Sequence, residues 1–256
     1  MKKCGFVYIA SLSKAYYKAA VNSAISLKDN YPEADITLFT HKAFLQEEDK
    51  KFFNNIFTDI PVHKRAKMWG MQRTPYDITL YLDSDTEIRS QNIKNVFDVL
   101  GKNDIMFTKI VPHVSNGTYI DDNNDLEYHG GIILYNNKKL TIQLIEEWYE
   151  LYHKQITVKW EESEFSQYTK KMQGWDQFTI WHLLRQPKYK KIKHDFFPDG
   201  GHSYNFIYLL EDERNQKNEP YLKFEQIVYH YTIPGDKVNV GYIKTPPGSI
   251  TDFNWI

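Results

Sequence analysis

The sequence predicts an α/β fold, in which a mostly parallel central sheet is flanked by helices and is followed by a smaller, irregular half. Apolar runs of strand length alternate with segments of helical apolar spacing in the first part of the chain, which is typical of parallel sheets. Hydrophobic residues make up 41% of the 256 residues and aromatic residues 16%, so the chain can bury a core. This length suits one large domain and excludes a disulfide-rich miniprotein.

The first part of the chain repeats a strand followed by a helix. The apolar run Gly5–Ala10 is interpreted as a strand rather than as part of a signal peptide. Ser13–Asn30 carries apolar residues at helical spacing, and Tyr31-Pro32 ends that helix. The expected elements that follow are a strand at Asp35–Thr40, a helix at Lys42–Phe53, a strand at Ile78–Leu82, a helix at Ile93–Leu100 and a strand at Asp104–Ile110.

The second part of the chain is less regular. The expected elements there are a polar loop at Ser115–Asp125, a strand at His129–Tyr135, helices at Leu140–Tyr152 and Trp175–Leu184, and short strands within Lys191–Phe197 and Phe224–Tyr231. Glu211–Pro220 is charged and poor in apolar residues, which indicates a solvated loop rather than a domain boundary. We therefore expect a single domain over residues 1–256.

Composition and charge exclude several classes of partner. The chain has 32 Lys and Arg residues against 33 Asp and Glu residues, so no overall field favours nucleic acid, which is not expected as a partner. No stretch approaches the roughly 18 apolar residues of a transmembrane helix, which leaves membrane contact to a surface patch or a partner. The single cysteine, Cys4, suits a reducing compartment. A soluble cytoplasmic protein is expected.

Two carboxylates stand at the end of the strand expected at Ile78–Leu82. In the segment Tyr81-Leu82-Asp83-Ser84-Asp85-Thr86, Asp83 and Asp85 are two residues apart, so they point to one side of an extended chain. At the carboxyl edge of a parallel sheet they can converge on one hard divalent cation, Mn²⁺ or Mg²⁺. Such a cation neutralises phosphate charge when a diphosphate leaves. The alternative is a pair of solvent-facing acids in a turn.

A histidine on a later apolar segment is a further candidate metal ligand. His230 lies in Val228-Tyr229-His230-Tyr231 and is followed by Gly235 and Lys237. An imidazole can complete a metal site, and a loop with a glycine and a lysine can bring amides and an ammonium group onto phosphate oxygens. The alternative is a half-buried, hydrogen-bonded histidine without a ligand.

Other candidates leave two readings open. Asp176, in Gly174-Trp175-Asp176-Gln177, either caps a helix or points into a site. The glycines of His129-Gly130-Gly131 either allow a substrate close to the backbone or form a strand bulge. Aromatic residues of the second half either line a sugar groove or belong to the core; these are Tyr119, Tyr128, Trp160 and Trp175.

Taken together, these motifs resemble the GT-A fold nucleotide-sugar glycosyltransferases, in particular retaining glycosyltransferase family 8, which includes glycogenin and bacterial galactosyltransferases. The ordered matches are Lys67, Thr74-Pro75-Tyr76, Tyr81 to Thr86, Asn92 to Phe97, Gly131 to Asn136, Asp176-Gln177 and His230 to Lys237. The resemblance covers most of the chain. It implies a GT-A domain with a nucleotide-binding half at about residues 1–110 and an acceptor half at about residues 111–256.

The resemblance also implies roles for particular residues. It implies that Asp83, Asp85 and His230 bind Mn²⁺ (or Mg²⁺) and that the donor is a UDP-sugar. The residues that it places on the nucleotide, the diphosphate or the rest of the donor are Ala10, Ser11, Tyr16, Lys67, Ser84, Gly131, Gly235 and Lys237. It places Asp176 on the hydroxyls of the donor sugar and Gln177 beside its reacting face. The family usually has Asn where His129 stands, so the identity of the sugar stays open.

The implied reaction is transfer of the sugar to a hydroxyl group of a carbohydrate or glycoconjugate, in glycan or polysaccharide synthesis. Retention by front-side attack is expected from the resemblance; for an inverting enzyme, Asp176 would be the natural general base. Two alternatives stay open, which are a catalytically inactive carbohydrate-binding protein of the same fold and a sugar nucleotidyltransferase. The second usually has a basic glycine-rich loop after the first strand, and Ala10-Ser11-Leu12-Ser13 has none.

Overall fold

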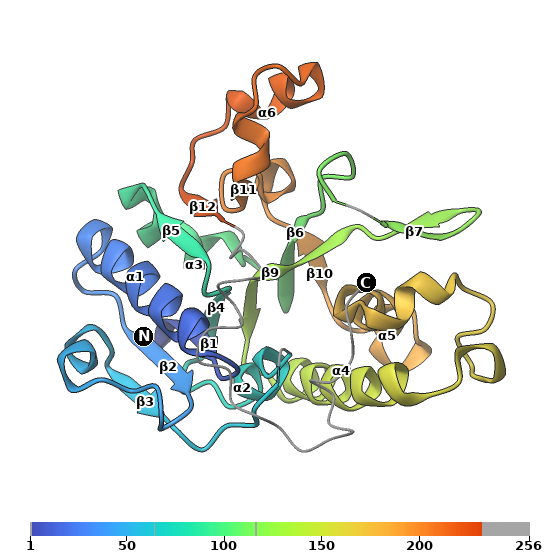
Figure 1. Cartoon of the computed structure of the whole chain (residues 1–256), viewed down its shortest axis with the longest axis horizontal. Helices are drawn as coiled ribbons and strands as arrows, with labels where there is room; N and C mark the ends of the chain where they lie inside the picture. Colours follow the sequence, from blue (N-terminus) through green and yellow to red (C-terminus); the bar gives the residue numbers. More distant parts are fainter. Residues whose placement is uncertain (1, 64, 116, 232–256) are drawn as a thin grey trace.

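The computed structural model describes residues 2–63, 65–115 and 117–231 of the chain, and a seven-stranded sheet lies at its centre (Figure 1). Its strands are β1 (Cys4–Ala10), β2 (Ile36–Thr40), β3 (Asn55–Phe57), β4 (Ile78–Leu82), β6 (Ile105–Lys109), β9 (Tyr128–Asn136) and β10 (His194–Phe196). They lie in the order β10-β6-β9-β4-β1-β2-β3. All neighbours are parallel except that β9 runs against both β4 and β6. The predicted mostly parallel sheet is confirmed.

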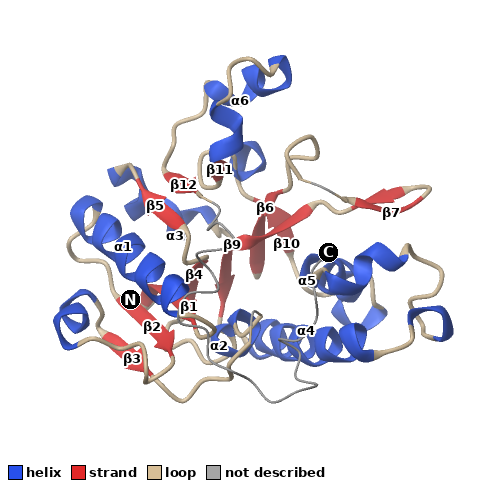
Figure 2. Cartoon of the chain, viewed as in Figure 1, coloured by secondary structure: helices blue, strands red, loops and turns tan. Residues whose placement is uncertain are grey.

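Helices cover both faces of this sheet (Figure 2). The α-helices are α1 (Lys14–Asn30), α2 (Lys67–Met71), α3 (Val96–Val99), α4 (Lys139–Thr157), α5 (Asp176–Leu184) and α6 (Glu219–Leu222). Short 3-10 helices are η1 (Glu47–Phe52), η2 (Gln91–Asn95), η3 (Trp160–Glu162), η4 (Lys170–Gly174), η5 (Pro187–Tyr189), η6 (Pro198–Gly201), η7 (Tyr208–Glu211) and η8 (Gln216–Asn218). Among the described residues, none of the helices combines the length and the apolar character that crossing a membrane requires.

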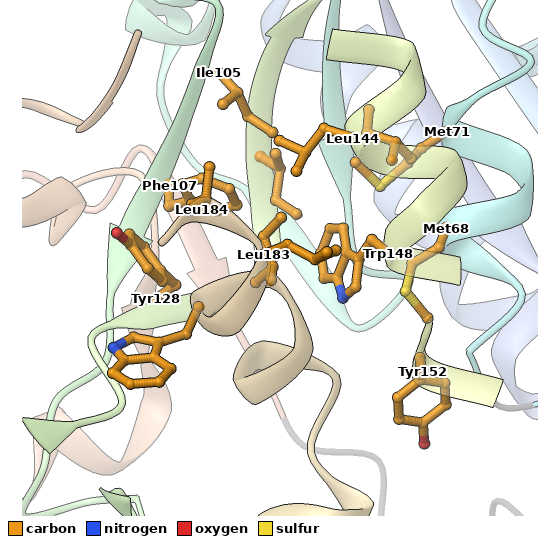
Figure 3. Packing of buried hydrophobic residues seen from close by; sticks show 14 of the residues in the cluster. Met68, Met71, Ile105, Phe107, Tyr128, Leu144, Trp148, Tyr152, Leu183 and Leu184 are labelled. Carbon is orange, nitrogen blue, oxygen red and sulfur yellow. The ribbon is translucent and has the colours of Figure 1, made fainter. Parts of the chain in front are cut away.

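Side-chain alternation along β1 divides the core into two clusters. Val7 and Ile9 pack in the cluster under α2, α4 and α5, whereas Phe6 and Tyr8 pack in the cluster under α1 and α3. This is the period-two pattern of a strand that is buried on both faces. Figure 3 shows the first cluster, where Trp148 of α4 lies among side chains of α2 and α5.

The sequence around α1 explains why the helix begins and ends where it does. The Ser13 hydroxyl accepts a hydrogen bond from the backbone N–H of Tyr16 and so caps the helix. The buried residues recur on one face, which packs against the sheet, and they are Tyr17, Ala20, Val21, Ser23, Ala24 and Leu27. The helix ends at Asn30, directly before Tyr31-Pro32, as predicted.

A second, small sheet joins distant parts of the chain. Its strands are β5 (Thr86–Ile88), β11 (Phe206–Ile207) and β12 (Val228–His230), in the order β11-β12-β5. β12 pairs antiparallel with β5, so His230 lies opposite Thr86. The sheet therefore brings the segment that carries His230 next to the residues that directly follow β4 (Figure 1).

Four predicted elements differ from the structure. The solvated loop predicted at Glu211–Pro220 is largely exposed, but it contains η8 and the start of α6, and Asn218 within it is fully buried. The helix predicted at Lys42–Phe53 is reduced to the 3-10 helix at its end; the Tyr17 hydroxyl accepts the N–H of Gln46 and donates to Asp49, which holds this segment in another conformation. The helix predicted at Ile93–Leu100 is split into η2 and α3. The predicted loop at Ser115–Asp125 contains a hairpin of β7 (Tyr119–Asp121) and β8 (Asn124–Asp125).

Candidate active site

The residues that carry the candidate site meet at the carboxyl edge of the seven-stranded sheet. Asp83 and Asp85 follow the end of β4, and His230 ends β12. One ligand atom from each of these three residues lies within 4.8 Å of the other two. We call Asp83, Asp85 and His230 the triad. The structure thus brings together the three residues that the sequence suggested as metal ligands.

Backbone hydrogen bonds fix the segment that holds the two carboxylates. The N–H of Asp83 donates to the carbonyl oxygen of Gly131 at 2.7 Å, which extends the β4–β9 ladder by one residue. The Thr86 hydroxyl donates to the carbonyl oxygen of Asp83 at 2.9 Å. Tyr81, which is buried, donates its hydroxyl to the Asp83 carboxylate. Hydrogen bonds therefore fix both the backbone and the carboxylate of Asp83. A solvent-facing acid in a turn would not have its carboxylate fixed by a buried side chain.

The histidine of the triad is tied to this segment through the small sheet. The N–H of Tyr231 donates to the carbonyl oxygen of Asp85 at 2.8 Å, and His230 Nε2 lies 3.4 Å from Asp85 Oδ1. Burial lowers the pKa of His230, but the contact with Asp85 and the charge of Asp83 outweigh it, so the pKa is raised overall. The negative charge of the triad thus favours a cation at this place.

Gly131 leaves room at the triad that no other residue would leave. A Cβ atom at this position would lie 2.7 Å from Asp83 Oδ2, 2.7 Å from His230 Cε1 and 2.8 Å from His129 Cε1. The absence of a side chain therefore lets Asp83, His230 and His129 approach the backbone here, and the approach of a substrate stays a prediction. The bulge reading holds, because the register of β6 and β9 shifts between Phe107 and Thr108, where Thr108 lies opposite His129.

A buried cluster of charges lies next to the triad. Asp176 is fully buried, with Oδ1 3.0 Å from Arg65 Nε and Oδ2 2.9 Å from Lys67 Nζ. Lys67 Nζ also donates to the carbonyl oxygen of Gly130 at 2.7 Å. Burial raises the pKa of Asp176, but the two cations outweigh it and lower the pKa overall. Trp175, not Asp176, occupies the N-cap position of α5, so capping is not the role of this carboxylate.

Gln177 lies beside this cluster. Its Oε1 atom is buried and accepts no hydrogen bond from the described residues. A Cβ atom at Gly130 would lie 3.4 Å from Gln177 Cγ and 3.3 Å from Asp176 Oδ2. Gly130, Asp176 and Gln177 therefore face one another, and the amide oxygen of Gln177 has capacity to accept a further hydrogen bond.

The residues expected on the nucleotide lie at the ends of β1 and β4. Ala10 ends β1 and is buried, and the hydroxyl of Ser11 donates to the carbonyl oxygen of His63 at 3.2 Å. The hydroxyl of Ser84 lies 3.4 Å from the carbonyl oxygen of Ile9, to which it donates. Tyr16, in the first turn of α1, is half-buried and packs against the cluster under that helix.

Several sequence-based expectations have other outcomes. Gly235 and Lys237 lie outside the described residues, so their expected place on the diphosphate stays a prediction. Tyr128 and Trp160 are buried in the core cluster under α4 and α5, which settles their role as packing residues. Tyr119 is exposed and Trp175 half-buried.

Arg65, which completes the charge cluster around Asp176, was not predicted from the sequence. It stands in an irregular segment before α2, where no apolar period marks it, and only the folded chain brings it to Asp176. Its one sequence signal is its position two residues before Lys67 in a locally basic stretch. Burial lowers the pKa of Arg65, but Asp176 outweighs it and raises the pKa further above its usual range.

The order of the strands and the antiparallel β9 match the GT-A fold of glycosyltransferases. Solved structures with this fold superpose on most of the chain. The glycosyltransferase GlyE of Streptococcus pneumoniae TIGR4 matches with a TM-score of 0.58 and 18% identity over 93% of this chain and 56% of that one. The chain thus spans little more than half the length of GlyE.

Two further solved structures match a similar share of this chain. The galactosyltransferase LgtC, solved with donor and acceptor sugar analogues, matches with a TM-score of 0.53 and 18% identity over 90% of this chain and 87% of that one. Mouse xyloside xylosyltransferase 1 matches with a TM-score of 0.51 and 11% identity over 90% of this chain and all of that one. No protein-family model and no curated protein matches the sequence. At these identities, the similarity establishes the fold.

Proposed function

We propose that the protein is a metal-dependent glycosyltransferase, which moves a sugar from a UDP-sugar to a hydroxyl group of a carbohydrate or glycoconjugate acceptor. The observation that carries the proposal is the triad: Asp83, Asp85 and His230 come from distant parts of the chain and meet within 4.8 Å at the carboxyl edge of the sheet. In open α/β sheets this edge is where ligands bind. The GT-A fold supports the same assignment.

The triad fits a divalent cation. Two carboxylates and an imidazole suit Mn²⁺, and the carboxylates also suit Mg²⁺. The space left by Gly131, beside Asp83 Oδ2 and His230 Cε1, is consistent with a ligand against the backbone. With the three protein ligands that the described residues supply, coordination positions remain for phosphate oxygens. The bound cation would stabilise the negative charge of the departing diphosphate.

The charges around Asp176 support transfer with retention. A general base works best with a pKa near the operating pH, whereas Arg65 and Lys67 lower the pKa of Asp176. A fully buried, doubly paired carboxylate is a weak base for an acceptor hydroxyl. In the proposed reaction Asp176 holds the two cations and orients the donor sugar, and the free Oε1 of Gln177 accepts a sugar hydroxyl.

The remaining parts of the proposal follow from position. Ala10 ends β1 on the same edge as the triad, Ser11 follows it, and Tyr16 lies in the first turn of α1; all three are proposed to contact the uridine. Ser84 stands between the two carboxylates and is proposed to contact the ribose or the diphosphate. The acceptor is proposed to bind along the second half of the chain, and the product class is a glycan or polysaccharide.

Nucleotide binding tests this proposal directly. Calorimetric titrations with UDP, GDP and dTDP, each with and without Mn²⁺, are expected to show binding of UDP that requires the metal. Asp83→Asn is expected to abolish it, because the substitution removes a charged ligand. Asp29→Asn, at an exposed position of α1, is the matched control and is expected to bind as the wild type does.

Other results would contradict parts of the proposal. UDP binding that is metal-independent and unaffected by Asp83→Asn would contradict a cation at the triad that holds the diphosphate, and preference for GDP or dTDP would contradict a UDP-sugar donor. Binding of glycans without any nucleotide would favour a carbohydrate-binding protein. If UDP binds, release of UDP from a panel of UDP-sugars and the anomeric configuration of the product, read by NMR, test transfer and retention.

A further inference from the structure

His230 is held on the side away from the carboxylates by a buried amide. His230 Nδ1 lies 2.8 Å from Asn205 Oδ1, and Asn205 is 2% exposed. The Asn205 Nδ2 atom donates to the hydroxyl of Thr108 at 3.1 Å. Thr108, on β6, is fully buried. The imidazole therefore stands between Asp85 on one side and a continuous chain of hydrogen bonds on the other.

The hydrogen bonds through Asn205 determine which ring nitrogen of His230 carries the proton. An amide oxygen only accepts, so the contact with Asn205 Oδ1 requires a proton on His230 Nδ1. In the neutral ring, Nε2 then has its lone pair, and Nε2 is the nitrogen that lies 3.4 Å from Asp85 Oδ1. Ligating histidines commonly donate their second ring N–H to a partner that fixes the tautomer and the ring orientation.

The fold builds this contact by bringing the turn before β11 close to β6. Gly201 has a φ of 78°, and a Cβ atom there would lie 2.6 Å from Thr108 Cγ2. Only a glycine allows both the left-handed conformation and this approach. Pairing of β11 with β12 then places Ile207 opposite His230. Asn205 thus reaches His230 from a segment that the seven-stranded sheet supports through Thr108.

We propose that Asn205, supported by Thr108, is a positioning residue that holds His230 with Nε2 turned toward the carboxylates and available to a divalent cation. The inference deepens the proposed function, because the cation is the one proposed there. Neither residue contacts the donor in this proposal; both act through His230.

Mn²⁺ binding, measured by the electron paramagnetic resonance signal of the free ion with and without UDP, tests the inference. Asn205→Leu removes the acceptor and is expected to weaken Mn²⁺ binding by about 10-fold to 100-fold. Asn205→Asp keeps an acceptor oxygen, toward which the Thr108 hydroxyl can turn, and is expected to bind within a few fold of the wild type. Thr108→Val is expected to lose less than Asn205→Leu, because Asn205 itself remains.

The chain offers a matched control in a second asparagine and histidine pair. Asn218 is fully buried, its Oδ1 lies 2.6 Å from His113 Nε2, and it belongs to the same region outside the main sheet. Asn218→Leu removes a similar contact without touching His230, and it is expected to leave Mn²⁺ affinity unchanged. A loss of affinity in Asn218→Leu equal to that in Asn205→Leu would overturn the inference, since general loosening would explain both. Wild-type affinity in a folded Asn205→Leu would also overturn it.

The proton on His230 gives a readout that does not depend on the metal or on catalysis. Nitrogen-15 NMR of the imidazole in the metal-free protein is expected to show a hydrogen-bonded Nδ1–H, which changes in Asn205→Leu and persists in Asn205→Asp. An unprotonated Nδ1 in the wild type, or an identical Nδ1–H in Asn205→Leu, contradicts the inference. If the wild type binds no Mn²⁺, the proposed function fails, and this spectrum still decides whether Asn205 positions the ring.

Discussion

Strands of the seven-stranded sheet reach nine residues and lie between two large apolar clusters, whereas the strands of the small sheet have two or three residues. In the small sheet, Ile88 and Val228 pack in the large cluster under α1 and α3, whereas Phe206 and Tyr229 belong to a separate cluster of four buried side chains with Val111 and Leu210. The first region carries Asp83 and Asp85, and the second carries His230. The triad thus joins a well-packed region to a thinly packed one.

Polar contacts compensate for the small core of the second region. The guanidinium of Arg89 lies 3.5 Å from the ring centre of Tyr229 and donates to the side chains of Gln226 and Tyr231. Asn205 adds its contact with His230. Such a region opens locally at lower cost than a large apolar core does. The comparison leads us to expect that His230 can lose its position while the seven-stranded sheet stays folded.

The largest expected effect comes from emptying the two cores separately. Phe107→Ala removes a fully buried ring from the main sheet and is expected to lower the free energy of unfolding by about 3–5 kcal/mol. Phe206→Ala, at an equally buried ring, is expected to act locally, with faster hydrogen exchange in β11 and β12 and little change in β1 and β4. Chemical denaturation and hydrogen exchange by mass spectrometry measure the two effects. Equal global destabilisation by both changes would show that the two regions fold as one unit.

The second prediction concerns the carboxylates on the well-packed side. Asp85→Asn is expected to lower turnover of a UDP-sugar by about 100-fold to 1000-fold, which corresponds to about 3–4 kcal/mol of transition-state stabilisation. The midpoint of thermal unfolding is expected to stay close to that of the wild type, because Asp85 lies beyond the end of β4. Kinetics and calorimetry check this. Full activity of the variant would remove the triad from the mechanism.

The third prediction uses a buried histidine next to the main sheet. Burial, with His153 and Arg65 nearby, lowers the pKa of His63 from 6.5 to about 3. The unfolded chain then binds a proton more readily than the folded one between these values. The contribution of His63 to the free energy of unfolding is therefore complete above pH 6.5. It falls below that pH, by up to about 1.4 kcal/mol per pH unit. In denaturation series from pH 7 to pH 4, His63→Gln should flatten this slope; an unchanged slope would assign it to other groups.

The smallest expected effect concerns Arg89 of the small sheet. Arg89→Leu removes the stacking on Tyr229 and the bonds to Gln226 and Tyr231, at partly exposed sites. Loss of the stacking is expected to cost the small sheet about 0.5–1 kcal/mol of stability. If all of this energy is lost from the positioning of His230, Mn²⁺ binding weakens a few fold. Metal titration of Arg89→Leu and Arg89→Lys measures it. No change in either variant would mean that β12 is held by its strand pairing.

Much of the well-packed region could be predicted from the sequence. The apolar run of β1 and the helical spacing in α1 are local patterns. Each element coincides with its pattern and ends where the pattern ends. The acids after β4 were predictable for the same reason, since the buried strand itself marks their place. These residues are determined by their immediate neighbours in the chain.

The thinly packed region could not be predicted to the same extent. β5 and β11 have three and two residues, which is too short for any periodicity to mark them. Arg65 and Asn205 act through contacts with Asp176 and His230 that only the folded chain creates. His230 itself was found through its motif, while the pairing of β12 with β5 that brings it to Asp85 was not.

The pairing of β5 with β12 also has a consequence for the order of synthesis. The ribosome releases the strands β1, β4 and β9 and the two carboxylates long before it releases His230, which lies near the end of the described residues. A nascent chain can therefore complete most of the seven-stranded sheet while the triad still lacks its third member. Any activity that depends on the triad begins only when translation has passed residue 230.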